Sequence, residues 1–400
     1  MIRGISMSHG KEWEHLRVAL VHHWLVKMRG GEKVLESLCR LFPKADIFTL
    51  VCEPGALTDR IKNHPIRTSW LQKIPGIARH YRNYLPLFPL AVESFDLTDY
   101  DLVLSSDASL CKGVLTQPGT CHICYCHSPM RSLWNGYHEF LTLSGNPWQK
   151  RFLPLVAHYL RTWDYHAASR VDYFISNSRN VAQRIGKFYG RDSTVIYPPI
   201  RIKDFQVTPQ PHDFFLAAGE LTPYKRFDLA IAAFNRLGLP LWVAGDGVDA
   251  RRLQKMAGNT IRFLGWISSE QLRSLQSRCR ALILPGEEDF GMTVPETHAS
   301  GRPVIALGKG GSLETILPYV NGLCFMEDTI DALCEALREF EKIETSFDPA
   351  EIRQSALKFD ETRFFQQIQE FVSTGLVEHR QRNTVQTAVP VEVYQRSLAN

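Results

Sequence analysis

Long apolar runs are missing from this sequence. No stretch approaches the roughly 20 residues that a membrane-spanning helix needs, and residues 1–15 lack the apolar core of a signal peptide. The nine cysteines are scattered without the spacing of a disulfide framework, which fits a reducing compartment. These features predict a cytoplasmic protein that is soluble or held peripherally at the cytoplasmic face of a membrane.

The sequence also has little net charge and few of the motifs that define other classes. A formal charge of +4, with no zinc finger, no aromatic-basic RNA motif and no long basic run, argues against nucleic acid as a partner. The segment Gly245–Arg251 lacks the third glycine of a dinucleotide fingerprint, so it does not predict an NAD site. Its 400 residues, 44% hydrophobic and 22% charged, fit two globular domains better than one.

One cysteine cluster raises the question of zinc. Cys121, Cys124 and Cys126 precede His127, but structural zinc usually takes ligands from two separate places, and no second Cys or His pair is evident. On a strand, Cys124 and Cys126 share one face while Cys121 points to the other. We therefore expect no metal site, and small core residues instead.

The most informative stretch is Leu284–Ala306. It reads as a strand end, an acidic loop with a glycine, a short helix from Thr293, and a new strand from Pro303. Glu288 and Glu296 lie eight positions apart, one on each side of a helix start. A helix start already attracts anions such as phosphate, so carboxylates beside it are better suited to accept hydrogen bonds from sugar hydroxyls. Two alternatives stay open: a capping box formed by Thr293 and Glu296, and a solvated acidic turn at residues 287–289.

Further polar groups fall where strands end or helices begin. Gly30 and Gly31 form a loop before a helix expected at Glu32–Leu41, and His127 follows a buried strand. Lys225 and Arg226 precede the predicted helix Phe227–Leu237, where they could meet a diphosphate, although a solvated basic turn is the plainer reading. A last strand is expected at Glu314–Phe325, and a terminal helix at Glu361–Phe371.

The segment Pro65–Glu93 mixes apolar and basic residues and is broken by three prolines. This composition is typical of short helices at a membrane interface, but it also suits an ordinary helical cover over a sheet.

The stretch from Glu288 through Gly291 to Glu296, with the following Gly301–Val304, resembles the E-x7-E signature of the family 4 retaining glycosyltransferases. This resemblance implies an α/β protein of the GT-B fold, with two Rossmann-like domains whose parallel sheets face across a cleft. The implied organisation is an acceptor-binding domain at 1–205, a nucleotide-sugar-binding domain at 206–357, a terminal helix at 358–375 that crosses back to the first domain, and a polar, weakly ordered tail at 376–400.

The resemblance also implies roles for individual residues. Glu288 would contact hydroxyls of the donor sugar, Glu296 the ribose diol, and His127 the sugar, with Arg131 reaching an anionic group. The remaining donor-binding positions would be Gly30, Gly31, Lys225, Arg226, Phe290, Gly291, Met292 and Thr293, with Leu264, Gly265 and Trp266 cradling the nucleobase. Glu220 stands where the family usually has an arginine, so Arg226 or Arg131 would have to supply that charge.

The implied activity is retaining transfer of a hexose from a nucleotide-sugar donor to a lipid-linked or polysaccharide-precursor hydroxyl. The segments Tyr125–Arg131 and Thr222–Asp228 resemble bacterial polysaccharide mannosyltransferases and favour GDP-mannose. No Asp-x-Asp motif occurs near the end of a predicted strand, so neither metal nor cofactor is expected. The alternatives are a GT-B nucleotide-sugar epimerase and a non-catalytic nucleotide-sugar-binding protein.

Overall fold

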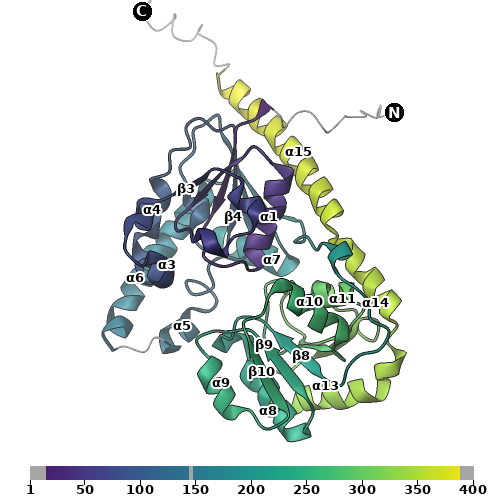
Figure 1. Ribbon diagram of the computed structural model, residues 1–400. Helices are drawn as coiled ribbons and strands as arrows, with labels where there is room; N and C mark the ends of the chain where they lie inside the picture. Colours follow the sequence, from purple (N-terminus) through teal and green to yellow (C-terminus); the bar gives the residue numbers. More distant parts are fainter. Residues whose placement is uncertain (1–14, 144–146, 388–400) are drawn as a thin grey trace, which may run out of the picture. The chain divides into compact units, whose positions relative to one another are not determined.

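The computed structural model describes residues 15–143 and 147–387, which form two compact units (Figure 1). Unit 1 contains the described residues up to Asn177, residues 181–196 and the chain from Phe365. Unit 2 contains residues 178–180 and 197–364. The division falls after Ile196, earlier than the expected boundary at residue 205, because the Tyr197 ring lies 5.7 Å from that of Phe290, within unit 2.

Unit 1 is built on a seven-stranded parallel sheet in the order β3-β2-β1-β4-β5-β6-β7. Every residue of β1, β4 and β5 is buried, as expected for central strands covered by helices on both faces. The strands are β1 (Val18–His22), β2 (Asp46–Thr49), β3 (Ile66–Thr68), β4 (Leu102–Asp107), β5 (Cys121–Cys126), β6 (Tyr173–Ser176) and β7 (Thr194–Val195).

The helices of unit 1 cover both faces of this sheet. Helices α3, α4 and α6 lie on one face, where their buried side chains pack against alternate residues of β1, β2 and β4 to form a hydrophobic core. Helix α1 lies on the other face (Figure 1). The helices are α1 (Gly30–Leu41), α2 (Asp59–Lys62), α3 (Ile77–His80), α4 (Phe88–Glu93), α5 (Tyr137–Leu143), α6 (Pro147–Ser169), α7 (Arg179–Tyr189) and α15 (Glu361–Thr387), with 3-10 turns η2 (Pro54–Ala56), η3 (Trp70–Lys73), η4 (Tyr81–Leu87) and η5 (Cys111–Gly113). The first residues of α7 and α15, 179–180 and 361–364, belong to unit 2.

Unit 2 has a six-stranded parallel sheet in the order β10-β9-β8-β11-β12-β13. Its strands are β8 (Phe215–Ala218), β9 (Leu241–Ala244), β10 (Ile261–Gly265), β11 (Leu282–Leu284), β12 (Val304–Leu307) and β13 (Gly322–Phe325). Its helices are α8 (Phe227–Leu237), α9 (Ala250–Met256), α10 (Ser269–Arg278), α11 (Thr293–Ala299), α12 (Ser312–Thr315), α13 (Ile330–Ile343) and α14 (Pro349–Ala356), with 3-10 turns η6 (Ile202–Asp204), η7 (Pro223–Lys225), η8 (Glu344–Ser346) and η9 (Leu357–Phe359). Two parallel-sheet Rossmann-like units of this kind are the GT-B fold that the sequence predicted.

Three expected elements differ from the structure. Helix α1 begins at Gly30, so both glycines lie in its first turn rather than in a preceding loop. The strand expected from Glu314 is wrong in its first part, because Glu314 lies in α12 and only Gly322–Phe325 forms β13. The Glu314 carboxylate instead accepts hydrogen bonds from the backbone N–H groups of Arg179 and Asn180, which belong to the same unit 2.

The terminal helix is longer than expected. α15 runs to Thr387, although the sequence placed a weakly ordered tail from residue 376. His379 explains the difference, because it is buried and its Nε2 lies 3.1 Å from the Pro118 carbonyl, which also accepts a hydrogen bond from the Asn383 amide. Residues 388–400 of the predicted tail lie outside the described residues. Among the helices that the structure describes, none is long and apolar enough to cross a bilayer.

Candidate functional site

The loops at the carboxyl edge of the unit 2 sheet approach one another at backbone distance. A Cβ atom on Gly245, which follows β9, would lie 1.8 Å from the carbonyl oxygen of Gly219, which follows β8. Gly286, which follows β11, leaves room for the backbone of Lys225, since a Cβ there would lie 2.7 Å from the Lys225 Cα. Side chains on these three loops are therefore gathered at one place, as the ends of parallel strands require.

Lys225 and Glu288 meet at this edge. The Lys225 Nζ lies 2.7 Å from the Glu288 Oε1, and each side chain is less than one-fifth exposed. Burial disfavours the ammonium form, but Glu288, Tyr224 and Glu220 together hold the pKa of Lys225 above its usual range. The sequence analysis named both residues as site candidates, but it assigned them to different parts of the donor and did not predict their pairing.

The neighbouring charged residues Glu220 and Arg226 interact with different partners. Glu220 acts on Lys225 and strengthens its charged form. Arg226 takes a left-handed backbone conformation, with φ of 53°, at the start of α8, and its guanidinium pairs with Asp228 at 3.2 Å and with Asp328. Arg226 therefore forms its ion pairs with these two aspartates, and the cation that pairs with Glu288 is Lys225.

The acidic loop between β11 and α11 is fixed by the loop after β12. The Gly311 N–H donates to the Glu288 carbonyl at 2.9 Å, and a Cβ on Gly311 would lie 2.4 Å from the Phe290 Cα. The Phe290 side chain is buried against Tyr197 and Phe359, so only its backbone is available to a ligand. The solvated-turn alternative does not describe Glu288, which is largely buried and paired with Lys225.

Glu296 lies in α11 and is buried. The capping-box alternative would make Thr293 the residue before the helix, but Met292 occupies that position and no side chain caps the helix start. Thr293 is the first helical residue, and its carbonyl accepts a hydrogen bond from the Thr297 hydroxyl at 2.7 Å. Gly291, with φ of 79°, makes the turn that leads into Met292.

The proposed nucleobase loop is only partly a loop, because Leu264 and Gly265 are the last two residues of β10 and Trp266 follows the strand. Gly265 has φ of 67° and its carbonyl accepts a hydrogen bond from the Gly245 N–H at 2.8 Å, which ties the loop to the end of β9. Leu264 is half-buried, whereas Trp266 is 73% exposed. Leu264 also lines a cavity of about 470 Å³ together with Trp242, Arg262 and residues of α10.

In unit 1, a hydrogen-bonded chain surrounds the start of α1. The Ser106 Oγ lies 2.9 Å from the His127 Nε2 and 3.1 Å from the His22 Nδ1. Gly31 lies against both imidazoles, since a Cβ there would be 3.5 Å from the nearest atom of each. The structure thus brings His127 and Gly31 together, and adds His22 and Ser106, which the sequence analysis missed. Their only signal in the sequence is that His22 is the last residue of a strand and Ser106 the last but one of another.

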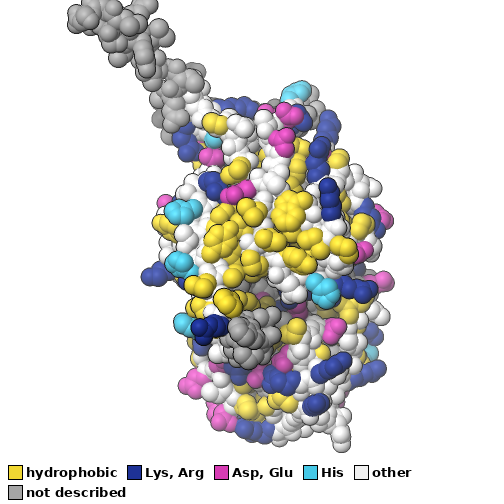
Figure 2. Space-filling view, turned by 90° about the vertical axis from the view of Figure 1, so that its left-hand side faces the viewer, with side chains coloured by type: hydrophobic (Ala, Val, Ile, Leu, Met, Phe, Trp, Pro, Cys, Tyr) yellow, Lys and Arg dark blue, Asp and Glu magenta, His cyan; other side chains and the backbone are white. Residues whose placement is uncertain are grey.

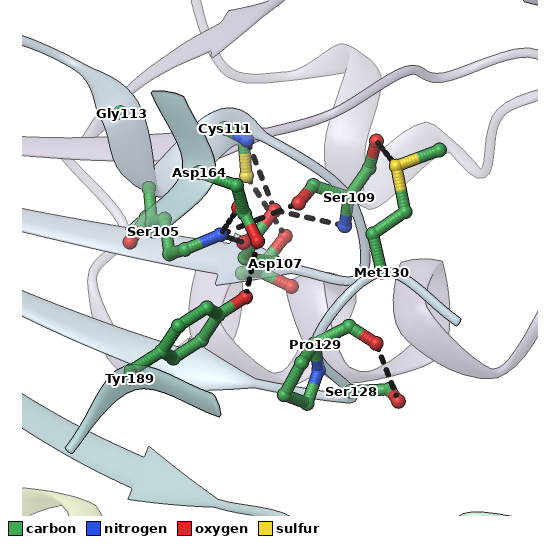
Figure 3. A network of polar contacts seen from close by, with 12 residues as sticks. Ser105, Asp107, Ser109, Cys111, Gly113, Ser128, Pro129, Met130, Asp164 and Tyr189 are labelled. Carbon is green, nitrogen blue, oxygen red and sulfur yellow. Dashed lines mark hydrogen bonds and ion pairs between the residues drawn. The ribbon is translucent and has the colours of Figure 1, made fainter. Parts of the chain in front are cut away.

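The backbone of His127 is held by a buried ionic network. Its N–H donates to the Asp107 carbonyl at 2.7 Å, and the Asp107 carboxylate lies 3.2 Å from the Lys112 ammonium. Asp164 from α6 also pairs with Lys112 and accepts a hydrogen bond from the Tyr189 hydroxyl at 2.8 Å (Figure 3). The Trp134 indole donates to the same carboxylate, also at 2.8 Å. Burial opposes the charge on Lys112, but the two aspartates raise its pKa well above the usual value.

This network also fixes the turn that follows His127. Trp134, which Asp164 holds, donates its backbone N–H to the Arg131 carbonyl at 3.2 Å, and Gly136 donates to the same oxygen at 2.8 Å. Arg131 is half-buried within this turn.

Three clusters of side chains with metal-ligating atoms occur among the described residues. They are His22–His23–Glu32, His23–Asp107–Cys111 and Cys121–Asp172–His379, each with ligand atoms within 4.8 Å of one another. Cys124 and Cys126, which the sequence analysis assigned to the core, are buried against α7 residues.

Two family profiles match the sequence in succession. The family described as "Glycosyltransferase Family 4" matches residues 28–204, and the one described as "Glycosyl transferases group 1" matches residues 200–358. The chain belongs to the family 4 glycosyltransferases. The second match includes Lys225, Glu288 and Glu296, and the first includes His127 and the start of α1.

Curated relatives of this family 4 glycosyltransferase include two mannosyltransferases. A "GDP-mannose-dependent alpha-mannosyltransferase" of Mycolicibacterium smegmatis is 30% identical over 186 residues, which are 44% of this chain and 49% of the relative. "O-antigen chain mannosyltransferase C" of Escherichia coli is 28% identical over 209 residues, 48% of this chain and 54% of the relative. The chain therefore spans about half the length of these relatives.

Solved structures share the fold of this family 4 glycosyltransferase over most of its length. Anabaena HepE in complex with UDP and glucose has a TM-score of 0.69 at 17% identity, covering 90% of this chain and 100% of that one. Sucrose-phosphate synthase from Thermosynechococcus elongatus has a TM-score of 0.68 at 18% identity, covering 90% and 99%.

Proposed function

We propose that this protein is a retaining hexosyltransferase that moves mannose from GDP-mannose to a hydroxyl of a lipid-linked or polysaccharide-precursor acceptor. The observation that carries the proposal is the pairing of Lys225 with Glu288 at the carboxyl edge of the unit 2 sheet, within a sequence that matches the family. The names of the mannosyltransferase relatives support the choice of mannose.

The Lys225–Glu288 pair suits a donor that carries both phosphates and hydroxyls. A diphosphate brings more negative charge than one carboxylate, so it competes with Glu288 for the Lys225 ammonium. Glu288 is then released to accept hydrogen bonds from sugar hydroxyls, and Glu296 accepts those of the ribose diol. Backbone groups from Phe290 to Thr293 lie between these two carboxylates in sequence and complete the donor site.

The proposed reaction retains configuration without a protein nucleophile. The bond between the sugar C1 and the diphosphate oxygen breaks, the acceptor oxygen bonds to C1 from the same face, and the acceptor proton passes to the departing phosphate. Lys225 stabilises the negative charge that develops on that phosphate, which is the electrostatic role that a cation fills at such a centre. Neither a metal ion nor a cofactor takes part in this proposal.

The donor proposal is tested by Lys225→Met. Loss of the ammonium should weaken GDP-mannose binding by roughly 10- to 100-fold, the scale of one charge-assisted contact of about 1.5–3 kcal/mol. Isothermal titration with GDP-mannose measures the effect, and Arg226→Met is the matched control because its guanidinium pairs with Asp228 and Asp328 instead. Unchanged affinity in Lys225→Met would remove this lysine from the site.

A turnover assay separates the candidate activities. The protein is incubated with GDP-mannose and a lipid-linked acceptor in the presence of chelator, and the products are analysed for mannosylated acceptor. Glycan transfer supports the proposal, epimerised free donor identifies a nucleotide-sugar epimerase, and binding without turnover identifies a non-catalytic binding protein.

A membrane-facing surface on unit 1 also belongs to the proposal. Figure 2 shows hydrophobic side chains gathered on the face that carries α3, α4 and α6, with basic side chains around them. The segment Pro65–Glu93 itself is mostly a cover over the sheet, since Leu71, Ile77 and Phe88 are buried. The exposed apolar residues of this segment include Trp70 and Leu90. Helix α6 adds an exposed apolar stripe formed by Phe152, Leu155 and Tyr159.

We expect this face to bind an anionic lipid surface at the cytoplasmic side of a membrane. Exposed Lys73, Arg79, Arg82 and Arg151 supply positive charge on the same elements. Leu155→Ser should reduce binding to phosphatidylglycerol-containing vesicles by roughly tenfold, because a leucine transferred to the membrane contributes about 1.5–3 kcal/mol. Vesicle co-sedimentation measures this, and Val248→Ser in unit 2, at an 81% exposed position, should change nothing. Equal binding by both variants would exclude α6 from the contact.

A further inference from the structure

A chain of four polar side chains in unit 1 ends at His127. His22 ends β1 and lies opposite Ser106 of β4 in the parallel register, which places their side chains on the same face of the sheet. The Ser106 hydroxyl lies between the two imidazoles, 3.1 Å from the His22 Nδ1 and 2.9 Å from the His127 Nε2. At the other end, the Glu32 Oε1 lies 3.8 Å from the His22 Nε2.

Glu32 is fixed in place by a second contact. Its Oε2 accepts the Arg29 N–H at 3.0 Å, which caps the first turn of α1, so Oε1 remains directed at His22. Both side chains are buried, and the His22 Nε2 has no hydrogen-bond partner. Burial is the main cause that lowers the pKa of His22 to about 4 and that of His127 to about 3, so both rings are neutral near pH 7.

A neutral imidazole carries its proton on one nitrogen only, so the chain has two possible directions. In the first, His22 carries its proton on Nε2 toward the Glu32 carboxylate, Ser106 donates to the His22 Nδ1, and the His127 Nε2–H donates to Ser106. In the second, every bond is reversed and the lone pair of the His22 Nε2 faces the carboxylate. The negative charge of Glu32 favours the first direction.

We propose that Glu32, His22 and Ser106 set the tautomer of His127 so that its Nδ1 presents a lone pair to the donor. In the described residues, the His127 Nδ1 makes no hydrogen bond. This nitrogen therefore accepts a hydrogen from a sugar hydroxyl and cannot donate one. The proposal rests on the proposed function for the identity of the donor, and His22, Ser106 and Glu32 are positioning residues.

The tautomer is measured without turnover. In protein labelled with ¹⁵N-histidine, the chemical shifts of the ring nitrogens should show the His127 Nε2 protonated and Nδ1 unprotonated. Glu32→Gln keeps an oxygen for the Arg29 N–H but can place an amide N–H opposite the His22 Nε2, which favours the second direction. The Nδ1–H form of His127 should then predominate. An Nδ1–H form in the wild-type protein, or no change in Glu32→Gln, would overturn the proposal.

Binding of fluorinated donors gives an independent measurement. Fluorine accepts a hydrogen bond weakly and donates none, so one of the monodeoxyfluoro analogues of GDP-mannose should bind at least fivefold more weakly than GDP-mannose itself. This penalty should shrink in Ser106→Ala, and a penalty that persists unchanged there would contradict the relay.

Ser105→Ala is the matched control. Its hydroxyl makes the equivalent 2.9 Å contact with His122 Nε2 one residue earlier on the same strand. The penalty and the His127 tautomer should both be retained in this variant. Failure of GDP-mannose to bind at all would count against the proposed function, whereas the ¹⁵N shifts would still decide the tautomer.

Discussion

Glu296→Gln should lower kcat/KM for sugar transfer by about 10²- to 10³-fold with little change in thermal stability. A carboxylate that accepts two hydroxyl hydrogens contributes two charge-assisted bonds, and their loss corresponds to about 3–4 kcal/mol. Glu296 is buried in α11, and glutamine keeps its size and one oxygen acceptor, so the amide should be tolerated by the fold. Steady-state kinetics with GDP-mannose and a melting curve are the two measurements.

The control for this prediction is Glu287→Gln, one position before Glu288 in the acidic loop. It removes the same charge from the loop that precedes α11, and we expect kcat/KM within about threefold of the wild-type value, as for a group outside the donor contact. A drop in melting temperature of Glu296→Gln that matched its loss of activity would instead assign the carboxylate to the stability of α11.

Lys112→Met should destabilise unit 1 by about 3–5 kcal/mol, the cost of leaving a buried charge without its partner. Lys112, Asp107 and Asp164 are all essentially inaccessible to solvent, so neither aspartate can be hydrated once the ammonium is removed. The melting temperature should fall by roughly 10 °C. Because the Asp107 carbonyl holds His127 and Asp164 holds Trp134, activity should fall as well.

Two further variants separate the buried network from a general effect of the substitution. Lys62→Met removes a half-exposed lysine whose partner Asp59 is almost fully exposed, and exposed pairs contribute about 0–1 kcal/mol, so its melting temperature should barely change. Adding Asp164→Asn to Lys112→Met removes one of the two unpaired carboxylates and should restore part of the lost stability. A double variant less stable than Lys112→Met would show that Asp164 acts mainly through Trp134 and Tyr189.

Hydrophobic patterning predicted most of the fold, and most reliably where chemical signals mark both ends of an element. The predicted helix Phe227–Leu237 matches α8 at both ends, because its buried residues follow one face and Gly238 ends it in the left-handed conformation. The strand expected from Glu314 failed because an apolar run cannot distinguish a strand from a short helix and turn followed by a shorter strand. The expected terminal helix was shorter than α15, because the last turns of α15 depend on tertiary contacts such as that of His379 with Pro118.

Local stretches of sequence named individual candidate residues, but they did not show which of those residues lie in contact. Glu288 and Glu296 belong to a single motif, so their spacing in the sequence is informative by itself. His22, Ser106 and Glu32 come from two strands and a helix, and only the register of β1 on β4 brings the first two together. The Lys112–Asp164 contact joins residues 52 positions apart, and no local pattern signals it.

The burial of the cysteines has a practical consequence for site-specific labelling. Eight of the nine thiols are buried and the ninth, Cys324, is half-buried. Burial is the main cause that raises the pKa of Cys39, Cys121 and Cys279 to about 12, which leaves almost no reactive thiolate at neutral pH. A new cysteine at an exposed position such as Val248 would therefore take up a maleimide dye in preference to the native thiols, so fluorescence labelling can proceed without first building a cysteine-free background.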